Sequence, residues 1–113
     1  MTGRRRVVMI DWDRISELQE EVGEEGVAEV IDIFLEEMDE GIAALSNLTA
    51  ASDIAEKLHF LKGSAQNIGL SHASALCQTF EERIKADPSA FPDVASLRSS
   101  LDAARGELGA FAG

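Results

Sequence analysis

A histidine, a lysine and a glycine in the middle of the chain are separated by about one helical turn: His59, Lys62 and Gly63. At about 100° per residue, Lys62, Gly63 and Gln66 lie within roughly 60° of His59 on one helix surface. A neutral imidazole is a competent nitrogen nucleophile near pH 7, and a cation one turn away can offset the charge of a phosphoryl group on the ring. Glycine inside a helix costs about 0.5 to 1 kcal/mol relative to alanine. Gly63 therefore indicates that a partner's backbone or a phosphoryl group needs the space beside His59.

Helical periodicity runs through the whole sequence, and no segment shows the alternation that is typical of strands. The sequence predicts a short first helix over residues 13–22 and four longer amphipathic helices over residues 27–48, 53–68, 71–86 and 93–111. Ser52 and Ser71 are the expected N-terminal caps of the second and third long helices. The expected inner faces of the long helices consist of Val27, Ile31, Phe34, Met38, Ile42, Leu45 and Leu48; Ile54, Leu58, Leu61, Ala65 and Ile68; Ala73, Leu76, Phe80 and Ile84; and Val94, Leu97, Leu101, Ala104, Leu108 and Phe111.

Short turns between these helices favour antiparallel neighbours. The predicted fold class is therefore all-α, an antiparallel up-down-up-down four-helix bundle with a short N-terminal capping helix. The apolar arc of the helix that carries His59 must face the core, so His59 should point outward, about 140° from the centre of that arc.

Composition narrows the classes of partner. The chain has 113 residues, the size of one domain, with 10 basic and 21 acidic side chains and a net charge of -11. Such a charge repels nucleic acid and anionic membrane surfaces. A single cysteine excludes an intramolecular disulfide, and no apolar run approaches the ~20 residues of a membrane span. We expect a cytoplasmic protein with a disordered basic tail over residues 1–10 and one helical domain over residues 11–113.

The run Leu58-His59-Phe60-Leu61-Lys62-Gly63-Ser64-Ala65, with Ile68-Gly69-Leu70 after it, resembles the signature of histidine-containing phosphotransfer (HPt) domains. That signature is a histidine, Lys-Gly at the third and fourth positions after it, a small pair, and a hydrophobic residue followed by glycine a turn later. Every one of these positions is filled in this sequence. The family's fold is the four-helix organisation that the periodicity predicts independently.

The resemblance implies a phosphorelay intermediate. His59 would accept a phosphoryl group from an aspartyl-phosphate on one receiver domain and pass it to another, with Lys62 as charge support and Gly63 as steric clearance. Ser64 and Gln66 would be candidate hydrogen-bond donors to the phosphoryl oxygens. The implied partners are response-regulator receiver domains and a hybrid sensor histidine kinase. The chain would be a monomeric phosphocarrier without autokinase activity, holding no cofactor or metal, and Mg²⁺ would belong to the receiver.

Three other interpretations of His59 compete with this one. Phosphoacceptor domains of sensor kinases place an acidic residue directly after the histidine, whereas Phe60 follows here. A di-iron bundle needs the Glu-x-x-His motif twice and facing the core, but the sequence holds it once, at Glu56, on an outward face. A helical adaptor that binds receivers or kinases without carrying phosphate stays open, although it has no need of the nucleophile.

Overall fold

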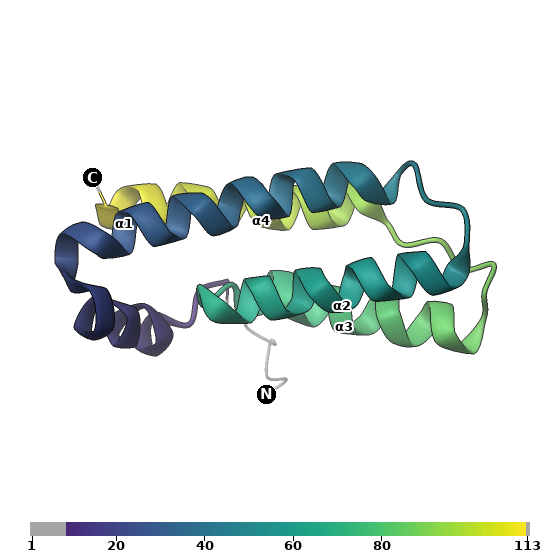
Figure 1. Cartoon of the computed structure of the whole chain (residues 1–113), viewed down its shortest axis with the longest axis horizontal. Coiled ribbons are helices and arrows are strands. Elements are labelled where there is room, and N and C mark those ends of the chain that lie inside the picture. The colour runs from purple at the N-terminus through teal and green to yellow at the C-terminus, as the bar shows by residue number, and fades with distance from the viewer. Residues whose placement is uncertain (1–8, 113) are drawn as a thin grey trace, which may run out of the picture.

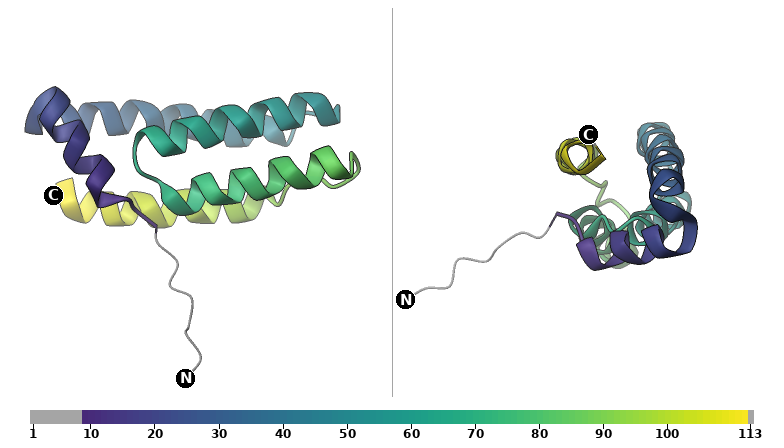
Figure 2. Two further views of the ribbon diagram at one scale, coloured as in Figure 1. Left: turned by 90° about the horizontal axis from the view of Figure 1, so that it is seen from below. Right: turned by 90° about the vertical axis from the view of Figure 1, so that its left-hand side faces the viewer.

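The computed structural model describes residues 9–112, with side chains described through Gly109. Four helices follow one another in the chain, α1 (Trp12–Leu45), α2 (Ala51–Asn67), α3 (Ser71–Ala86) and α4 (Val94–Ala112), and the described residues contain no strand (Figure 1). Each helix runs antiparallel to the next, and α2 and α3 lie side by side with α1 behind α2 and α4 behind α3 (Figure 2, left). The predicted all-α up-down-up-down bundle is confirmed.

A kink at Gly23 divides α1 into a short segment, residues 12–22, and a long one, residues 24–45. Gly23 has φ 83° and ψ 164°, a backbone conformation that residues with a Cβ rarely adopt. The short segment turns back beneath the ends of α1 and α4 that extend past the α2–α3 turn (Figure 1), and it buries Ile15 and Leu18 there. It is the predicted capping helix.

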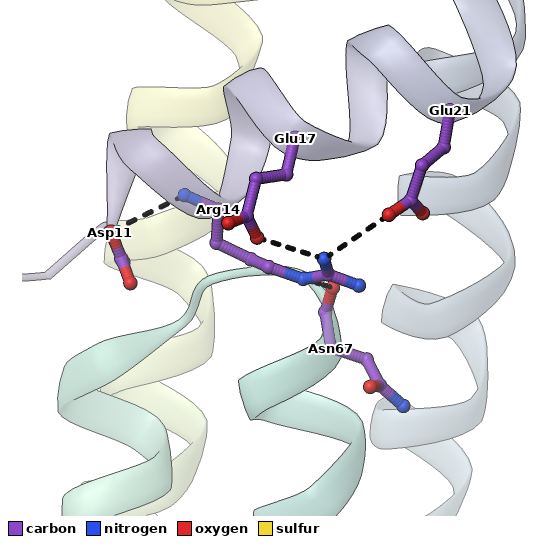
Figure 3. Close-up of polar contacts among 5 residues, drawn as sticks. All are labelled: Asp11, Arg14, Glu17, Glu21 and Asn67. Carbon is purple, nitrogen blue, oxygen red and sulfur yellow. Dashed lines mark hydrogen bonds and ion pairs between the residues drawn. The ribbon is translucent and has the colours of Figure 1, made fainter.

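Polar contacts fasten this capping segment to the turn between α2 and α3. The Asp11 N–H donates to the Gly69 carbonyl oxygen at 2.7 Å, and Arg14 Nε donates to the carbonyl oxygen of Asn67 at 3.0 Å (Figure 3). Arg14 also forms ion pairs with Glu17 and Glu21, so two carboxylates flank the guanidinium that contacts the last carbonyl group of α2. A cation is favourable there because a helix C-terminus carries partial negative charge. The end of the helix that carries His59 is thus fixed.

The core follows the predicted apolar positions with a few differences. Leu35 and Cys77 are buried, although neither is among the predicted inner-face residues. Four residues predicted on the inner faces are only half-buried: Phe34, Leu48, Leu76 and Val94. α2 begins after Ala50 and α3 after Leu70, one or two residues before the expected serine caps, and neither of these N-terminal caps makes a side-chain hydrogen bond.

Both ends of the chain extend beyond the described structure. Most of the predicted basic tail, residues 1–10, falls outside the described residues. Its last two residues, Met9 and Ile10, pack against the core and so belong to the folded domain. Phe111 lies outside the described side chains.

Close packing of α1 on α2 depends on Gly41. A Cβ at this buried position would lie 2.7 Å from Cδ2 of Leu61, whose side chain is fully buried. We expect Gly41→Ala to lower the free energy of unfolding by about 1–2 kcal/mol, because overpacking outweighs the helix propensity that alanine gains. Gly106→Ala is the matched control, since a Cβ there meets nothing within 4 Å. That variant should be more stable by about 0.5–1 kcal/mol.

Denaturant unfolding of the two variants measures both effects. A Gly41→Ala protein as stable as the Gly106→Ala protein would contradict this account of the α1–α2 contact.

Candidate functional site

His59 lies on the outer surface of the bundle, beside the seam between α2 and α3. Its neighbours Leu58 and Leu61 are fully buried and fix the rotation of α2, so the His59 side chain, 68% exposed, points outward. Another protein or a small molecule can therefore reach the imidazole without any opening of the fold.

A buried carboxylate on α3 contacts the imidazole. Glu81 Oε2 lies 3.3 Å from His59 Nδ1, and the Glu81 side chain is only 8% exposed. The same carboxylate forms ion pairs with Lys85 Nζ at 2.9 Å and Lys62 Nζ at 3.3 Å. Among the described residues, none forms a hydrogen bond or ion pair with His59 Nε2. The site therefore engages one ring nitrogen and leaves the other available.

The two lysines keep Glu81 ionised. Burial raises the pKa of the Glu81 carboxyl, but Lys85 and Lys62 together outweigh burial, and the pKa lies below its ordinary value of 4.5. Glu81 Oε1 is buried without a well-aligned hydrogen bond, and the ion pair with Lys62 is its one charged contact among the described residues. A buried carboxylate with two cations retains its negative charge beside the imidazole at neutral pH.

This arrangement predicts a pH dependence of stability. The pKa of Glu81 is lower in the folded protein than in the unfolded chain. The contribution of the ionised carboxylate to the free energy of unfolding is therefore fully present above about pH 4.5, and it is lost as the pH falls through the folded pKa. We expect the free energy of unfolding to fall more steeply between about pH 5 and 2 in the wild type than in Glu81→Gln. Denaturant titrations at a series of pH values measure both slopes, and equal slopes would contradict the ion-pair account.

The Lys62 side chain does not lie on an open, exposed ridge beside His59, as the sequence predicts. Its side chain is only 18% exposed, and its amine is directed at Glu81. In the resting site it neutralises the buried carboxylate, and its role as charge support for a phosphoryl group stays a prediction.

Gly63 and Gln66 are on the His59 side of α2, whereas Ser64 is not. A Cβ at Gly63 would meet nothing within 4 Å, so no contact inside the bundle requires this glycine. Gln66 is exposed, and its role stays a prediction. Ser64 is 5% exposed and lies about 140° around the helix from His59, so we do not retain it as a phosphoryl ligand.

Sequence reasoning missed Glu81 and Lys85. The signal available was spacing, because Glu81 follows the buried Cys77 by four residues and precedes Lys85 by four. An acid that continues a buried row of α3, with a lysine one turn later, indicates a neutralised carboxylate.

The other histidine is engaged elsewhere. His72 Nδ1 lies 2.7 Å from the Oγ of Ser100, which joins α3 to α4. Within residues 9–109, no group of three His, Cys, Asp or Glu side chains could hold a metal ion. None of the helices in the described part of the chain has the length and apolar character needed to cross a bilayer.

Comparison with known proteins gives two matches. The model of a family described as "Hpt domain" matches residues 29–107. "Phosphorelay protein LuxU" of Vibrio harveyi is 36% identical over 73 residues, which cover 62% of this chain and 61% of that protein. No solved structure matches the chain significantly.

Proposed function

The chain belongs to the Hpt domain family, and on that premise we propose that it is a phosphorelay intermediate of two-component signalling that carries a phosphoryl group on His59. One observation supports this most strongly, the exposed imidazole whose Nδ1 lies against a buried, ionised carboxylate. LuxU, the phosphorelay protein of similar sequence, supports the same function.

Glu81 sets the tautomer of His59 in this proposal. A carboxylate only accepts hydrogen bonds at neutral pH, so it favours the ring form with its proton on Nδ1. The lone pair then resides on Nε2, the nitrogen without a partner in the described structure. Glu81 thereby makes the outward nitrogen the nucleophile.

The transfer step needs no proton donor on this chain. The Nε2 lone pair attacks the phosphorus of an aspartyl-phosphate, the N–P bond forms, and the P–O bond to the aspartate breaks with its electron pair left on the carboxylate. The ring gains positive charge, which the Glu81 carboxylate stabilises. Attack by a second aspartate on phosphorus reverses the step and returns the ring to its neutral form.

Charge compensation is shared between this chain and its partner. Lys62 and Lys85 already lie within 3.3 Å of Glu81, and with a neutral His59 the four groups carry a net charge of about +1 before a phosphoryl group of about -2 arrives. We propose that Mg²⁺ is held by the receiver domain, where it neutralises phosphoryl charge.

The proposed partners are response-regulator receiver domains and a hybrid sensor histidine kinase. In this proposal the chain is a monomer without autokinase activity and binds these partners in the cytoplasm.

Incubation with a phosphorylated receiver domain tests the function, with transfer of acid-labile, alkali-stable label to the chain as the expected result. Binding of the receiver without transfer of label would instead favour an adaptor.

A further inference from the structure

A groove lies between α1 and α4, toward the end of the bundle that the capping segment covers (Figure 1). Its volume is about 520 Å³, and Gln19 of the capping segment lines one end of it. The floor consists of four apolar side chains, each at most 5% exposed: Val27, Ile31, Leu35 and Leu108. A hollow of this volume with an apolar floor is typical of sites that bind a ligand or bulky side chains.

The rim of this groove carries negative charge that is not neutralised. Glu24 and Asp32 on α1 are exposed, and neither forms a hydrogen bond or an ion pair among the described residues. Arg105 is the one cation among the described lining residues, and it already contacts Asp39 at 2.7 Å and Asp102 at 3.7 Å. The whole of α1, with twelve carboxylates and one arginine, adds to the negative potential at the rim.

One wall of the groove has no side chain. Gly109 on α4 lines the groove, and a Cβ at this position would meet nothing within 4 Å. Packing within the bundle therefore does not require a glycine here, although glycine in a helix costs about 0.5 to 1 kcal/mol relative to alanine. The missing side chain leaves the apolar floor accessible beside Leu108.

An apolar floor with an acidic rim favours one kind of occupant. A bulky apolar side chain can cover the floor, and lysine or arginine residues beside it can pair with Glu24 and Asp32. A second copy of this chain is a poor occupant, because its own α1 carries the same negative charge. The charge of the rim repels any other acidic protein for the same reason.

We propose that this groove is a docking site for a basic amphipathic helix of another protein. Apolar side chains of that helix occupy the floor, and its basic side chains contact the carboxylates of the rim. Because α1 and α4 lie behind α2 and α3, whose outer surface carries His59, the groove and the imidazole are accessible at the same time (Figure 2). Occupation of the groove requires no phosphoryl transfer by His59.

The probe for this site is a fluorescent peptide of about 18 residues, or five helical turns, with leucine on one face and lysine on the other. Fluorescence anisotropy gives its Kd, and changes in the amide NMR signals of the chain locate it. We expect the largest changes at Val27, Ile31 and Leu108. A peptide of equal length with glutamate in place of lysine should not bind.

Gly109→Leu fills the open wall and should weaken the Kd by about tenfold or more, because its side chain occupies volume that the peptide needs. Gly106→Leu is the matched control, since Gly106 also has open space around its Cβ position on α4 but does not line the groove. Its Kd should stay within about twofold of wild type. Circular dichroism checks that both variants are folded.

The double variant Glu24→Gln, Asp32→Asn removes the two free carboxylates of the rim. It should weaken the Kd about three- to tenfold at low salt, and the loss should shrink at about 0.5 M salt, where charges are screened. Asp53→Asn, Glu56→Gln is the matched control, because it removes the same charge from exposed positions on α2. That control should change the Kd by less than about twofold.

Equal Kd values for Gly109→Leu and Gly106→Leu, or for the two double variants, would overturn the groove as the binding site. NMR changes centred on α2 and α3 would have the same consequence. A dimer of the chain alone that is lost in Gly109→Leu would identify a second copy as the occupant, and would also overturn the proposal.

Discussion

Substitution of His59 by glutamine is expected to abolish acceptance of a phosphoryl group from a phosphorylated receiver domain. The glutamine amide has a similar length and can still donate a hydrogen bond toward Glu81, but it has no nucleophilic nitrogen lone pair. The substitution is on a side chain that is 68% exposed, so the bundle should remain folded. Acid-labile, alkali-stable label on the chain measures the effect, and circular dichroism checks the fold.

His72→Gln is the control for this experiment, because His72 is the only other histidine and contacts Ser100. Its transfer rate should stay within about twofold of wild type, since peripheral contacts contribute little to the step. Equal labelling of His59→Gln and wild type would show that the phosphoryl group is carried elsewhere.

Substitution of Gly63 by glutamine is expected to lower kcat/KM for transfer by about 100-fold, since misplacement of the reacting groups by about 1 Å can cost as much. The new side chain has open space in the isolated protein, because a Cβ at Gly63 meets nothing within 4 Å. It would therefore be tolerated by the fold and would occupy the volume that a docked receiver needs. Single-turnover transfer from the phosphorylated receiver measures the loss.

Gly106→Gln is matched to this change, since Gly106 is also in a helix with open space around its Cβ position. That variant should transfer at the wild-type rate, and both variants should accept phosphoryl groups from phosphoramidate. If Gly63→Gln accepted the phosphoryl group from the receiver domain as fast as Gly106→Gln, the proposal that Gly63 leaves space for a docked receiver domain would be excluded.

Much of the site on α2 could be predicted because one helix has a fixed geometry. Leu58 and Leu61 are apolar at helical spacing, and burial of both determines that His59 points outward. The capping helix was also predictable, because Gly23 interrupts the first apolar stripe and adopts the positive φ that glycine permits.

The partner of His59 could not be predicted in the same way. Glu81 comes from a different helix, and the register of α3 against α2 depends on how the two surfaces interlock rather than on the periodicity of either. The same limit explains why Lys62 was expected on an open ridge: the helical wheel does not show that its long side chain reaches a buried carboxylate across the seam.

The central claim is tested most directly by a measurement that shows which nitrogen of the imidazole, Nδ1 or Nε2, carries the phosphoryl group. In a ¹⁵N-imidazole NMR experiment on the chain labelled by a phosphorylated receiver domain, we predict one phosphohistidine, at His59, with the phosphoryl group on Nε2 and a proton on Nδ1 facing Glu81. A phosphoryl group on Nδ1, or on any residue other than His59, would contradict the account.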